Sequence, residues 1–188
     1  MPETLCIPRE PSRLLAACYE LAEILSSAVL VIAILFSFAV RFAGVVGYSM
    51  LPTLVQDDWL AITAHLPEPQ RGSIVIISPR TNRLYEPLVK RVIAVAGDEI
   101  DIRDGQVWVN GEALDEPYLT VNPLTLPAHE HLSNIEYPAI VPDNAVFVLG
   151  DNRGGSTDSR HEEIGFVRTD DILGRVIFRL WPAPQAIR

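Results

Sequence analysis

The stretch Gly47-Tyr48-Ser49-Met50-Leu51-Pro52-Thr53-Leu54 lies where the character of this 188-residue chain changes. Before it comes a long apolar segment, and after it come short runs of β-branched residues separated by turn residues. The stretch places a serine just beyond the apolar segment. Most serines are ordinary turn or surface residues, so Ser49 by itself is weak evidence for chemistry. Its meaning depends on the rest of the chain.

The apolar segment is predicted to be a single membrane-spanning helix. Ile24 to Val40 contain no charged residue, and Arg41 closes the run. With its flanks, the segment 20–43 reaches the roughly 20 residues that a helix needs to cross a bilayer. A cleaved secretory signal would be followed by an Ala-x-Ala site, and a buried helix of a soluble protein would show a polar face. The sequence has neither feature here.

Basic residues on the two sides of this segment predict its orientation. Arg9 and Arg13 precede it, whereas Arg41 is the only basic residue that closely follows it. The positive-inside rule therefore predicts a cytosolic N-terminal segment over residues 1–19 and an extracytoplasmic domain over residues 44–188. Both cysteines, Cys6 and Cys18, precede the segment, so no disulfide can link parts of that domain.

The domain that follows is predicted to be mostly β and antiparallel. Asp104-Gly105 lies between two alternating runs, which is a strong signal for a two-residue hairpin, and Asn110-Gly111 supplies the next turn. Residues 112–143 are Pro-rich with little periodicity and indicate a loop-rich excursion of the same domain. Strands are expected over residues 59–63, 73–78, 89–95, 99–103, 106–110, 145–149 and 172–180.

Composition narrows the classes of function. The formal net charge of -9 argues against nucleic acid as a partner. The two cysteines and four histidines show no spacing typical of a metal site, so neither a metal nor another cofactor is expected.

A second stretch, Leu88 to Asp98 (LVKRVIAVAGD), contains the only lysine among the 15 basic residues, Lys90. Arginine cannot lose its proton in a protein, whereas burial can lower the pKa of a lysine until it acts as a base. The apolar neighbours Val89, Val92 and Ile93 would supply such burial. From composition alone, a neutral catalytic amine and a partly exposed strand lysine both remain open.

A third stretch, Val146 to Arg160 (VFVLGDNRGGSTDSR), is a predicted strand that enters a loop rich in Gly, Asp and Ser. Such a loop fits a cation site, a phosphate-binding loop or a structural turn. Arg153 and Arg160 argue against calcium, and the missing Walker-type lysine argues against phosphate binding.

Together, these blocks resemble bacterial type I signal peptidase, also called leader peptidase. The matching blocks are Ser-Met-x-Pro-Thr-Leu at 49–54, Arg-Gly-Ser-Ile-Val at 71–75, Lys-Arg-Val-Ile-x-x-x-Gly-Asp at 90–98 and the stretch 146–160. The resemblance runs from the apolar segment to about Trp181. It implies a serine endopeptidase of the bacterial plasma membrane that removes signal peptides from secretory preproteins, after small residues of the Ala-x-Ala kind. It also implies an antiparallel β fold with its cleft at the surface of the lipid bilayer.

The resemblance assigns roles residue by residue. Ser49 matches the nucleophile, Lys90 the general base, and Ser156 the hydroxyl that holds the lysine amine in place. A serine–lysine pair is a known variant of triad logic. Some members of the family carry a serine at the position of Gly47, and its hydroxyl helps form the oxyanion hole. Here only backbone N–H groups are available, and that of Ser49 is the best candidate.

Two charged pairs are implied to brace the site without taking part in the chemistry. They are Asp151 with Arg91 and Asp158 with Arg160. Ser73 stands where the family usually has an aspartate, which leaves the supporting role at that position open.

The sequence argues against three other classes of protein. A Ser-His-Asp hydrolase would need one of the four histidines, His65, His129, His131 or His161, beside Ser49. The Gly-x-Ser-x-Gly motif typical of many such hydrolases is also absent from the sequence. A self-cleaving repressor-type protease would lack the membrane segment and carry a DNA-binding region. A membrane-tethered binding domain would not need both Ser49 and Lys90.

We also expect an exposed apolar patch beside Ser49, facing the membrane.

Overall fold

The computed structural model describes residues 13–63, 68–78, 86–120, 123–128 and 133–187. These residues form two compact units that divide between Ala39 and Val40, and each unit is described by itself. The elements are α1 (Arg13–Ala39), β1 (Val40–Gly44), β2 (Trp59–Thr63), β3 (Ile74–Ile77), β4 (Leu88–Val95), β5 (Glu99–Arg103), β6 (Gln106–Val109), β7 (Glu112–Ala113), β8 (Ala139–Ile140), β9 (Ala145–Leu149), η2 (Arg153–Gly155), β10 (Val167–Arg168), η3 (Thr169–Asp171), β11 (Ile172–Trp181) and β12 (Gln185–Ala186).

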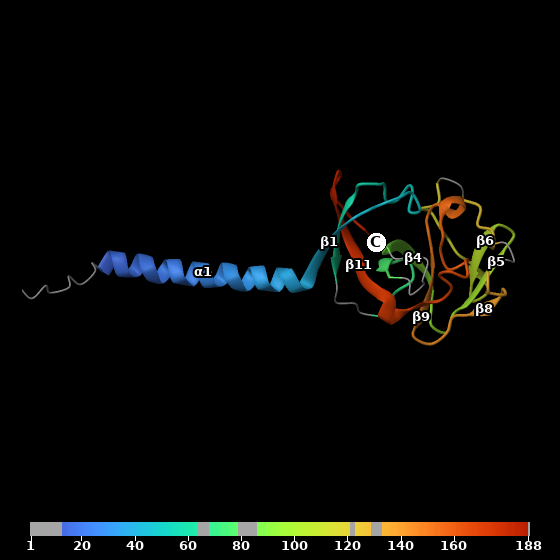
Figure 1. Cartoon of the computed structure of the whole chain (residues 1–188), viewed down its shortest axis with the longest axis horizontal. Helices are drawn as coiled ribbons and strands as arrows, with labels where there is room; N and C mark the ends of the chain where they lie inside the picture. Colours follow the sequence, from blue (N-terminus) through green and yellow to red (C-terminus); the bar gives the residue numbers. More distant parts are fainter. Residues whose placement is uncertain (1–12, 64–67, 79–85, 121–122, 129–132, 188) are drawn as a thin grey trace, which may run out of the picture. The chain divides into compact units, whose positions relative to one another are not determined.

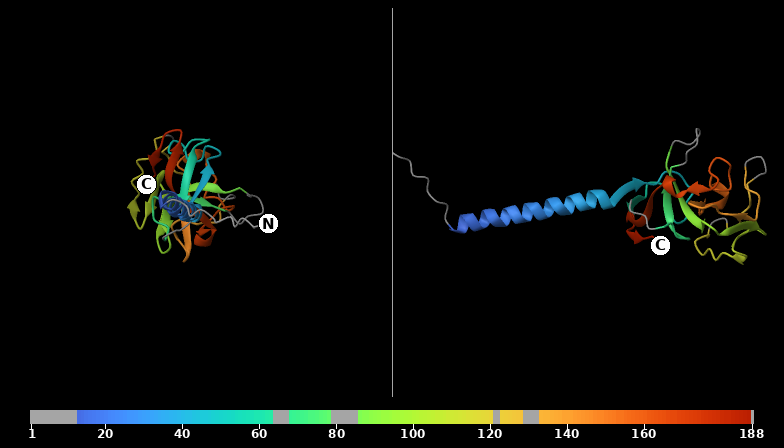
Figure 2. Two further views of the ribbon diagram at one scale, coloured as in Figure 1. Left: turned by 90° about the vertical axis from the view of Figure 1, so that its left-hand side faces the viewer. Right: turned by 90° about the horizontal axis from the view of Figure 1, so that it is seen from below.

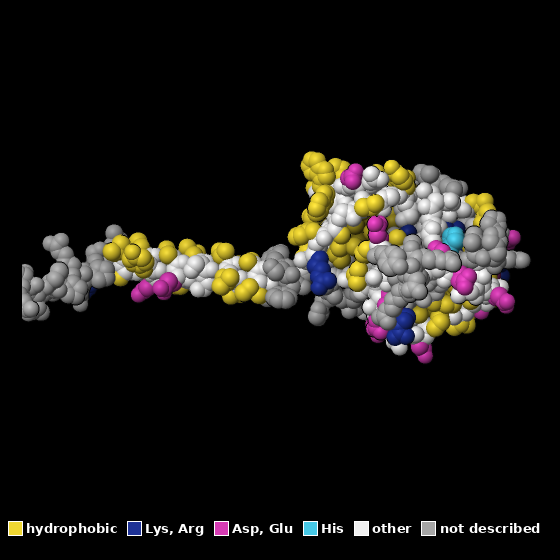
Figure 3. All heavy atoms as spheres, viewed as in Figure 1, with side chains coloured by type: hydrophobic (Ala, Val, Ile, Leu, Met, Phe, Trp, Pro, Cys, Tyr) yellow, Lys and Arg dark blue, Asp and Glu magenta, His cyan; other side chains and the backbone are white. Residues whose placement is uncertain are grey.

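The first unit contains one long helix, α1 (Figure 1). Within it, Leu15–Ile34 are long and apolar enough to cross a membrane. Figure 3 shows apolar side chains along the helix and acidic ones gathered near its N-terminal end. The predicted helix over residues 20–43 is wrong at its C-terminal end. Residues 40–43 belong to β1, because Val40–Gly44 pair in antiparallel register with Trp59–Thr63 and so direct their hydrogen bonds to a neighbouring strand.

The second unit is built from antiparallel strands, as the sequence predicts. One sheet has the order β1-β2-β11-β3-β4-β9-β10, with β12 also pairing with β11. A smaller sheet has the order β7-β6-β5-β8. The strands curl around a common interior (Figures 1 and 2). The loop-rich excursion 112–143 supplies β7 and β8, and β8 pairs with β5, so the excursion belongs to this same unit.

Both predicted turns are confirmed. Asp104 and Gly105 have φ values of 53° and 76° and join β5 to β6 with Arg103 opposite Gln106. Asn110 and Gly111, with φ values of 53° and 80°, join β6 to β7. Positive φ at both central residues gives a twist that matches the flanking strands, which is why Asp-Gly and Asn-Gly favour such turns.

The apolar core surrounds strand β4. Its neighbours β3 and β9 are buried at every residue, which explains why both are continuous apolar runs in the sequence. In the register of the sheet, Lys90 lies opposite Val75 of β3, and Arg91 lies opposite Leu149 of β9. The strand that carries the only lysine therefore runs through the middle of the larger sheet.

Candidate active site

The loop that follows β1 places Ser49 beside β4 and β9. Met50 and Leu54 are buried and anchor this loop in the core. The backbone N–H of Asn152 donates to the carbonyl oxygen of Ser49 at 2.9 Å, and the Asn152 side chain donates to the carbonyl of Tyr48 at 3.1 Å. Thr53 donates from its hydroxyl to the carboxylate of Asp151. The loop is therefore bound to Asp151 and Asn152, which directly follow the end of β9.

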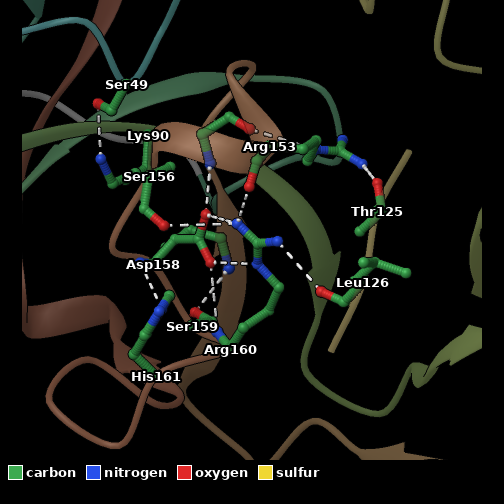
Figure 4. Close-up of polar contacts among 12 residues, drawn as sticks. Ser49, Lys90, Thr125, Leu126, Arg153, Ser156, Asp158, Ser159, Arg160 and His161 are labelled. Carbon is green, nitrogen blue, oxygen red and sulfur yellow. Dashed lines mark hydrogen bonds and ion pairs between the residues drawn. The ribbon is translucent and has the colours of Figure 1, made fainter. Parts of the chain in front are cut away.

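Lys90, on β4, contacts Ser49 of this loop (Figure 4). Its Nζ donates to the Ser49 Oγ at 2.8 Å. The lysine side chain is almost completely buried, with 2% of the residue exposed. Burial lowers the pKa of Lys90 to about 8. The charge of Arg160 adds to this lowering, whereas the charges of Asp158 and Asp151 partly oppose it. With this pKa, about a tenth of the amine is neutral at pH 7 and about half at pH 8.

Ser156 lies next to this pair but does not hydrogen-bond to it. Its Oγ is buried and has no hydrogen-bond partner among the described residues. The Ser156 side chain covers Gly150 instead, where a side chain would collide with it. The predicted contact between Ser156 and the lysine amine is thus not formed in this structure, although Figure 4 shows Ser156 close to Lys90.

The close approach at Gly150 gives a stability prediction. A Cβ at this position would meet the Ser156 side chain and would lie 2.5 Å from the carbonyl oxygen of Ser49. Backbone cannot move aside as a flexible side chain does, so we expect Gly150→Ala to destabilise the fold by about 1–3 kcal/mol. Thermal or urea unfolding measures this, and an unchanged midpoint would contradict the packing described here.

Arg91 and Asp151 form a buried ion pair. The Arg91 Nε and Nη2 donate to the two carboxylate oxygens at 2.8 and 2.7 Å, and its Nη1 donates to the carbonyl of Gly72 at 2.8 Å. The side chains are 5% and 1% exposed. Two parallel hydrogen bonds fix both orientation and distance, so this pair ties β4 to the start of the loop after β9.

Arg160 and Asp158 form a second buried pair within that loop. Arg160 Nε and Nη2 donate to the two Asp158 oxygens at 2.8 and 2.9 Å. Asp158 also accepts from the N–H of Gly150 at 3.0 Å. The pair thereby closes the loop Gly150–Arg160 back on its own beginning, which holds Ser156 and Asp158 near Lys90 (Figure 4).

Of the four histidines, only His161 lies in the part of the chain that the structure describes. Its Nδ1 accepts from the N–H of Asp158 at 3.4 Å, so it belongs to the loop beyond the Ser49–Lys90 pair. His65, His129 and His131 lie outside the described residues. The described residues also contain no group of three or more His, Cys, Asp and Glu side chains able to hold a metal ion.

An apolar groove of about 410 Å³ adjoins Ser49. Val45 is buried in the core, whereas Val46 is 83% exposed and Tyr48, next to the serine, is 59% exposed. Figure 3 shows apolar side chains gathered over the edge of the sheet near β1 and β11. The groove is lined by Ala43, Gly44, Val45, Val46, Gly47, Ser49, Met50, Ile76, Glu86, Pro87, Leu88 and Val89.

Several residues around the site were missed from the sequence. Thr53 and Asn152 lie inside the matched blocks, but their partners are about 100 positions away in the chain. Arg153 was noted only as evidence against calcium. Glu116, in the excursion, contacts Arg153, and nothing in the local pattern around Glu116 indicates this.

Comparison with known proteins identifies the family. The family model described as "Signal peptidase, peptidase S26" matches residues 18–181. The chain belongs to this family. It is therefore a signal peptidase: a serine endopeptidase that cleaves signal peptides from preproteins.

Individual relatives agree with the family. A probable signal peptidase I-2 from Synechocystis sp. (strain ATCC 27184 / PCC 6803 / Kazusa) is 35% identical over 88% of this chain and 74% of its own. Signal peptidase I from Bacillus caldolyticus is 37% identical over 84% of this chain and 88% of its own. A crystal structure of a signal peptidase I from Enterococcus faecalis V583 covers 59% of this chain and 98% of its own, with 30% identity and a TM-score of 0.47.

Proposed function

We propose that this signal peptidase works through Ser49 as nucleophile and Lys90 as general base. The observation that carries the proposal is the 2.8 Å contact between Lys90 Nζ and Ser49 Oγ, made by a buried lysine. A serine hydroxyl is a poor nucleophile unless a base lies in reach, and a lysine can serve as that base only when it is neutral. Burial, which lowers the pKa of Lys90 to about 8, favours the neutral amine.

The reaction follows from these two side chains. Neutral Lys90 accepts the Ser49 proton as Oγ attacks the scissile carbonyl carbon. The resulting ammonium then gives that proton to the leaving amine, and the C–N bond breaks to leave an ester on Ser49. Water, deprotonated by the same amine, attacks the ester and releases the signal peptide as a carboxylic acid. Ser49 recovers its proton from Lys90, so the proton balance closes.

Three supporting roles complete the proposal. The backbone N–H of Ser49 stabilises the oxyanion, because Gly47 has no side chain to contribute. Ser156 offers its unpartnered hydroxyl to the Lys90 amine when the amine leaves Ser49 during the reaction. The pairs Arg91–Asp151 and Asp158–Arg160 hold the two sides of the site.

We place the substrate residues that precede the cleaved bond in the apolar groove beside Ser49. Ala43, Gly44 and Gly47 line it with little or no side chain, and its other lining residues are mostly apolar. Such walls let the backbone of an extended substrate approach closely, and the preference for Ala-x-Ala is carried over from the resemblance to the family. We therefore assign preproteins with Ala-x-Ala-like sites as the substrates.

We further propose that the enzyme is a single-pass protein of the bacterial plasma membrane. Residues 1–19, which include the first turns of α1, would be cytosolic, the rest of α1 would cross the bilayer, and residues 44–188 would form the extracytoplasmic peptidase domain. Leu15–Ile34 support the crossing. Phe42, Trp59 and Trp181 are 63%, 53% and 65% exposed and would let the domain contact lipid, since tryptophan favours the headgroup region. The cleft would then open towards the outer membrane surface.

The proposed mechanism predicts how cleavage depends on pH. Only neutral Lys90 can accept the serine proton, so kcat/KM should rise with pH and level off above an apparent pKa of about 8. Cleavage of a preprotein with an Ala-x-Ala site by the purified full chain measures this profile.

Two controls make the measurement decisive. Ser49→Ala should leave no detectable cleavage, and a preprotein with isoleucine in place of the last alanine should be cut far more slowly. A rate that stays level from acidic to alkaline pH in a folded enzyme would rule out a lysine base with the pKa given above.

A further inference from the structure

Glu116 links the excursion 112–143 to the loop of the active site. Its two carboxylate oxygens accept from Nη1 and Nη2 of Arg153, the first at 3.0 Å. The side chains of Arg153 and Glu116 are 0% and 8% exposed, so the pair is shielded from water. Thr125, from the same excursion, also accepts from Arg153. A buried arginine needs such partners, because an uncompensated charge in the interior is costly.

Arg153 in turn lies at the centre of the loop Gly150–Arg160. Its Nε donates to the carbonyl of Gly150 at 3.2 Å, and its own carbonyl accepts from Arg160 at 2.8 Å. Arg160 is the guanidinium that holds Asp158. Fixing Arg153 therefore fixes the loop that carries Ser156 and Asp158 past Lys90 (Figure 4).

Glu116 also reaches strand β4 through Tyr118. The Tyr118 hydroxyl donates to the Glu116 carboxylate at 2.6 Å, and the guanidinium of Arg91 lies 3.9 Å from the centre of the Tyr118 ring. Burial, together with the neighbouring carboxylate, raises the pKa of Tyr118, so the phenol keeps its proton and stays a donor. Arg91 is the residue next to Lys90 in β4, so this contact helps to hold the strand that carries the proposed base.

We propose that Glu116 is a positioning residue for the reaction at Ser49 and Lys90. It joins the loop Gly150–Arg160 to strand β4, and the two together exclude water from the lysine amine. The proposal rests on the proposed function, because it assumes that Lys90 is the base. It assigns a role in catalysis to the excursion 112–143.

Loss of Glu116 is expected to raise the pKa of Lys90. The groups around Lys90 are Ser49, the loop residues Asp151, Asp158 and Arg160, and the apolar Val75 of β3. Burial is the largest of the influences that lower the pKa of Lys90. A loosened loop admits water to the amine, so the pKa rises towards the value of about 10.4 for a free lysine. The enzyme then needs a higher pH to reach the same rate.

The chain offers a direct measurement, because Lys90 is its only lysine. Full-length protein labelled with ¹³C-lysine in detergent micelles gives a single side-chain signal, whose titration reports the pKa of Lys90. In Glu116→Ala we expect this pKa, and the rising limb of the kcat/KM profile, to move up together by about one unit or more. In Glu116→Gln, which keeps an oxygen for Arg153 and Tyr118, we expect a smaller shift in the same direction.

Asp98→Ala is the matched control. Asp98 is also a shielded carboxylate paired with an arginine, Arg71, and its side chain is 9% exposed, but it lies at the turn between β4 and β5. We expect this variant to lose thermal stability while its Lys90 pKa and pH profile stay at the wild-type values. If both Glu116 variants lose stability in the same way, with the Lys90 signal and the pH profile unchanged, Glu116 is only structural and the proposal is overturned.

Two further comparisons between variants complete the test. If Glu116→Ala does not fold, Glu116→Gln decides, and an unshifted Lys90 pKa in that variant overturns the proposal. Lys90→Arg, assayed alongside, distinguishes failure of the proposed function from failure of the positioning role of Glu116. If it cleaves substrate at the wild-type rate, the proposed function fails; if it is inactive while the Glu116 variants show no shift, only the positioning role fails.

Discussion

Arginine in place of Lys90 is expected to lower kcat/KM for signal-peptide cleavage by at least about 10²–10⁴-fold, the usual contribution of a general base. Arginine keeps the positive charge but cannot give up a proton at any pH at which the protein is folded. The loss should therefore be nearly as complete as in Lys90→Ala, and it should not recover at alkaline pH. Initial cleavage rates of a purified preprotein from pH 6 to pH 10 measure this outcome.

Size must be separated from chemistry in this test, because Lys90 is buried and arginine is larger. Lys90→Met supplies the control, since it has nearly the shape of lysine without the amine. We expect it to fold, to be at least as stable as the wild type at neutral pH, and to be as inactive as Lys90→Arg. Substantial turnover by either variant would show that Lys90 contributes only charge or packing.

Removal of Asp151 is expected to cause the largest loss of stability among single changes around the site. Asp151→Ala leaves the Arg91 guanidinium buried without its carboxylate, since the two side chains are only 5% and 1% exposed. Breaking a buried pair by removing one partner costs about 3–5 kcal/mol. That is a large share of the roughly 5–15 kcal/mol by which a domain is stable. Urea unfolding of the full chain gives the difference.

The surface pair Arg168–Asp170 provides the matched comparison. Its side chains are 61% and 67% exposed, so Asp170→Ala should cost only about 0–1 kcal/mol. If Asp151→Ala does not fold, the double variant Arg91→Met with Asp151→Leu should fold, because it removes both charges from the interior together. Equal effects of Asp151→Ala and Asp170→Ala would show that the Arg91–Asp151 pair is not buried as described.

Much of the fold follows from local sequence patterns. Asp104-Gly105 and Asn110-Gly111 predict their turns because these residue types accept positive φ, and φ is positive at all four. The apolar runs at β3 and β9 predict strands because both are buried throughout. The end of the helix was misplaced because Val40 to Ala43 are as compatible with a membrane helix as with a strand. Their pairing with β2 decides the matter, and that partner lies about 20 residues further along the chain.

The candidate chemistry could be predicted from the order of the residues: one serine follows an apolar segment, one lysine lies in an apolar strand, and four ordered blocks resemble a family. How these groups meet depends on contacts between distant parts of the chain. Ser49 and Lys90 are 41 positions apart, and they lie 2.8 Å from each other because the loop after β1 is bound to Asn152, beyond the end of β9, which pairs with β4. The burial of Lys90, the missing partner of Ser156 and the contact of Glu116 with Arg153 likewise depend on residues far away in the chain. Periodicity and turn residues report the neighbourhood along the chain, whereas the pKa of an amine depends on which distant side chains exclude water from it.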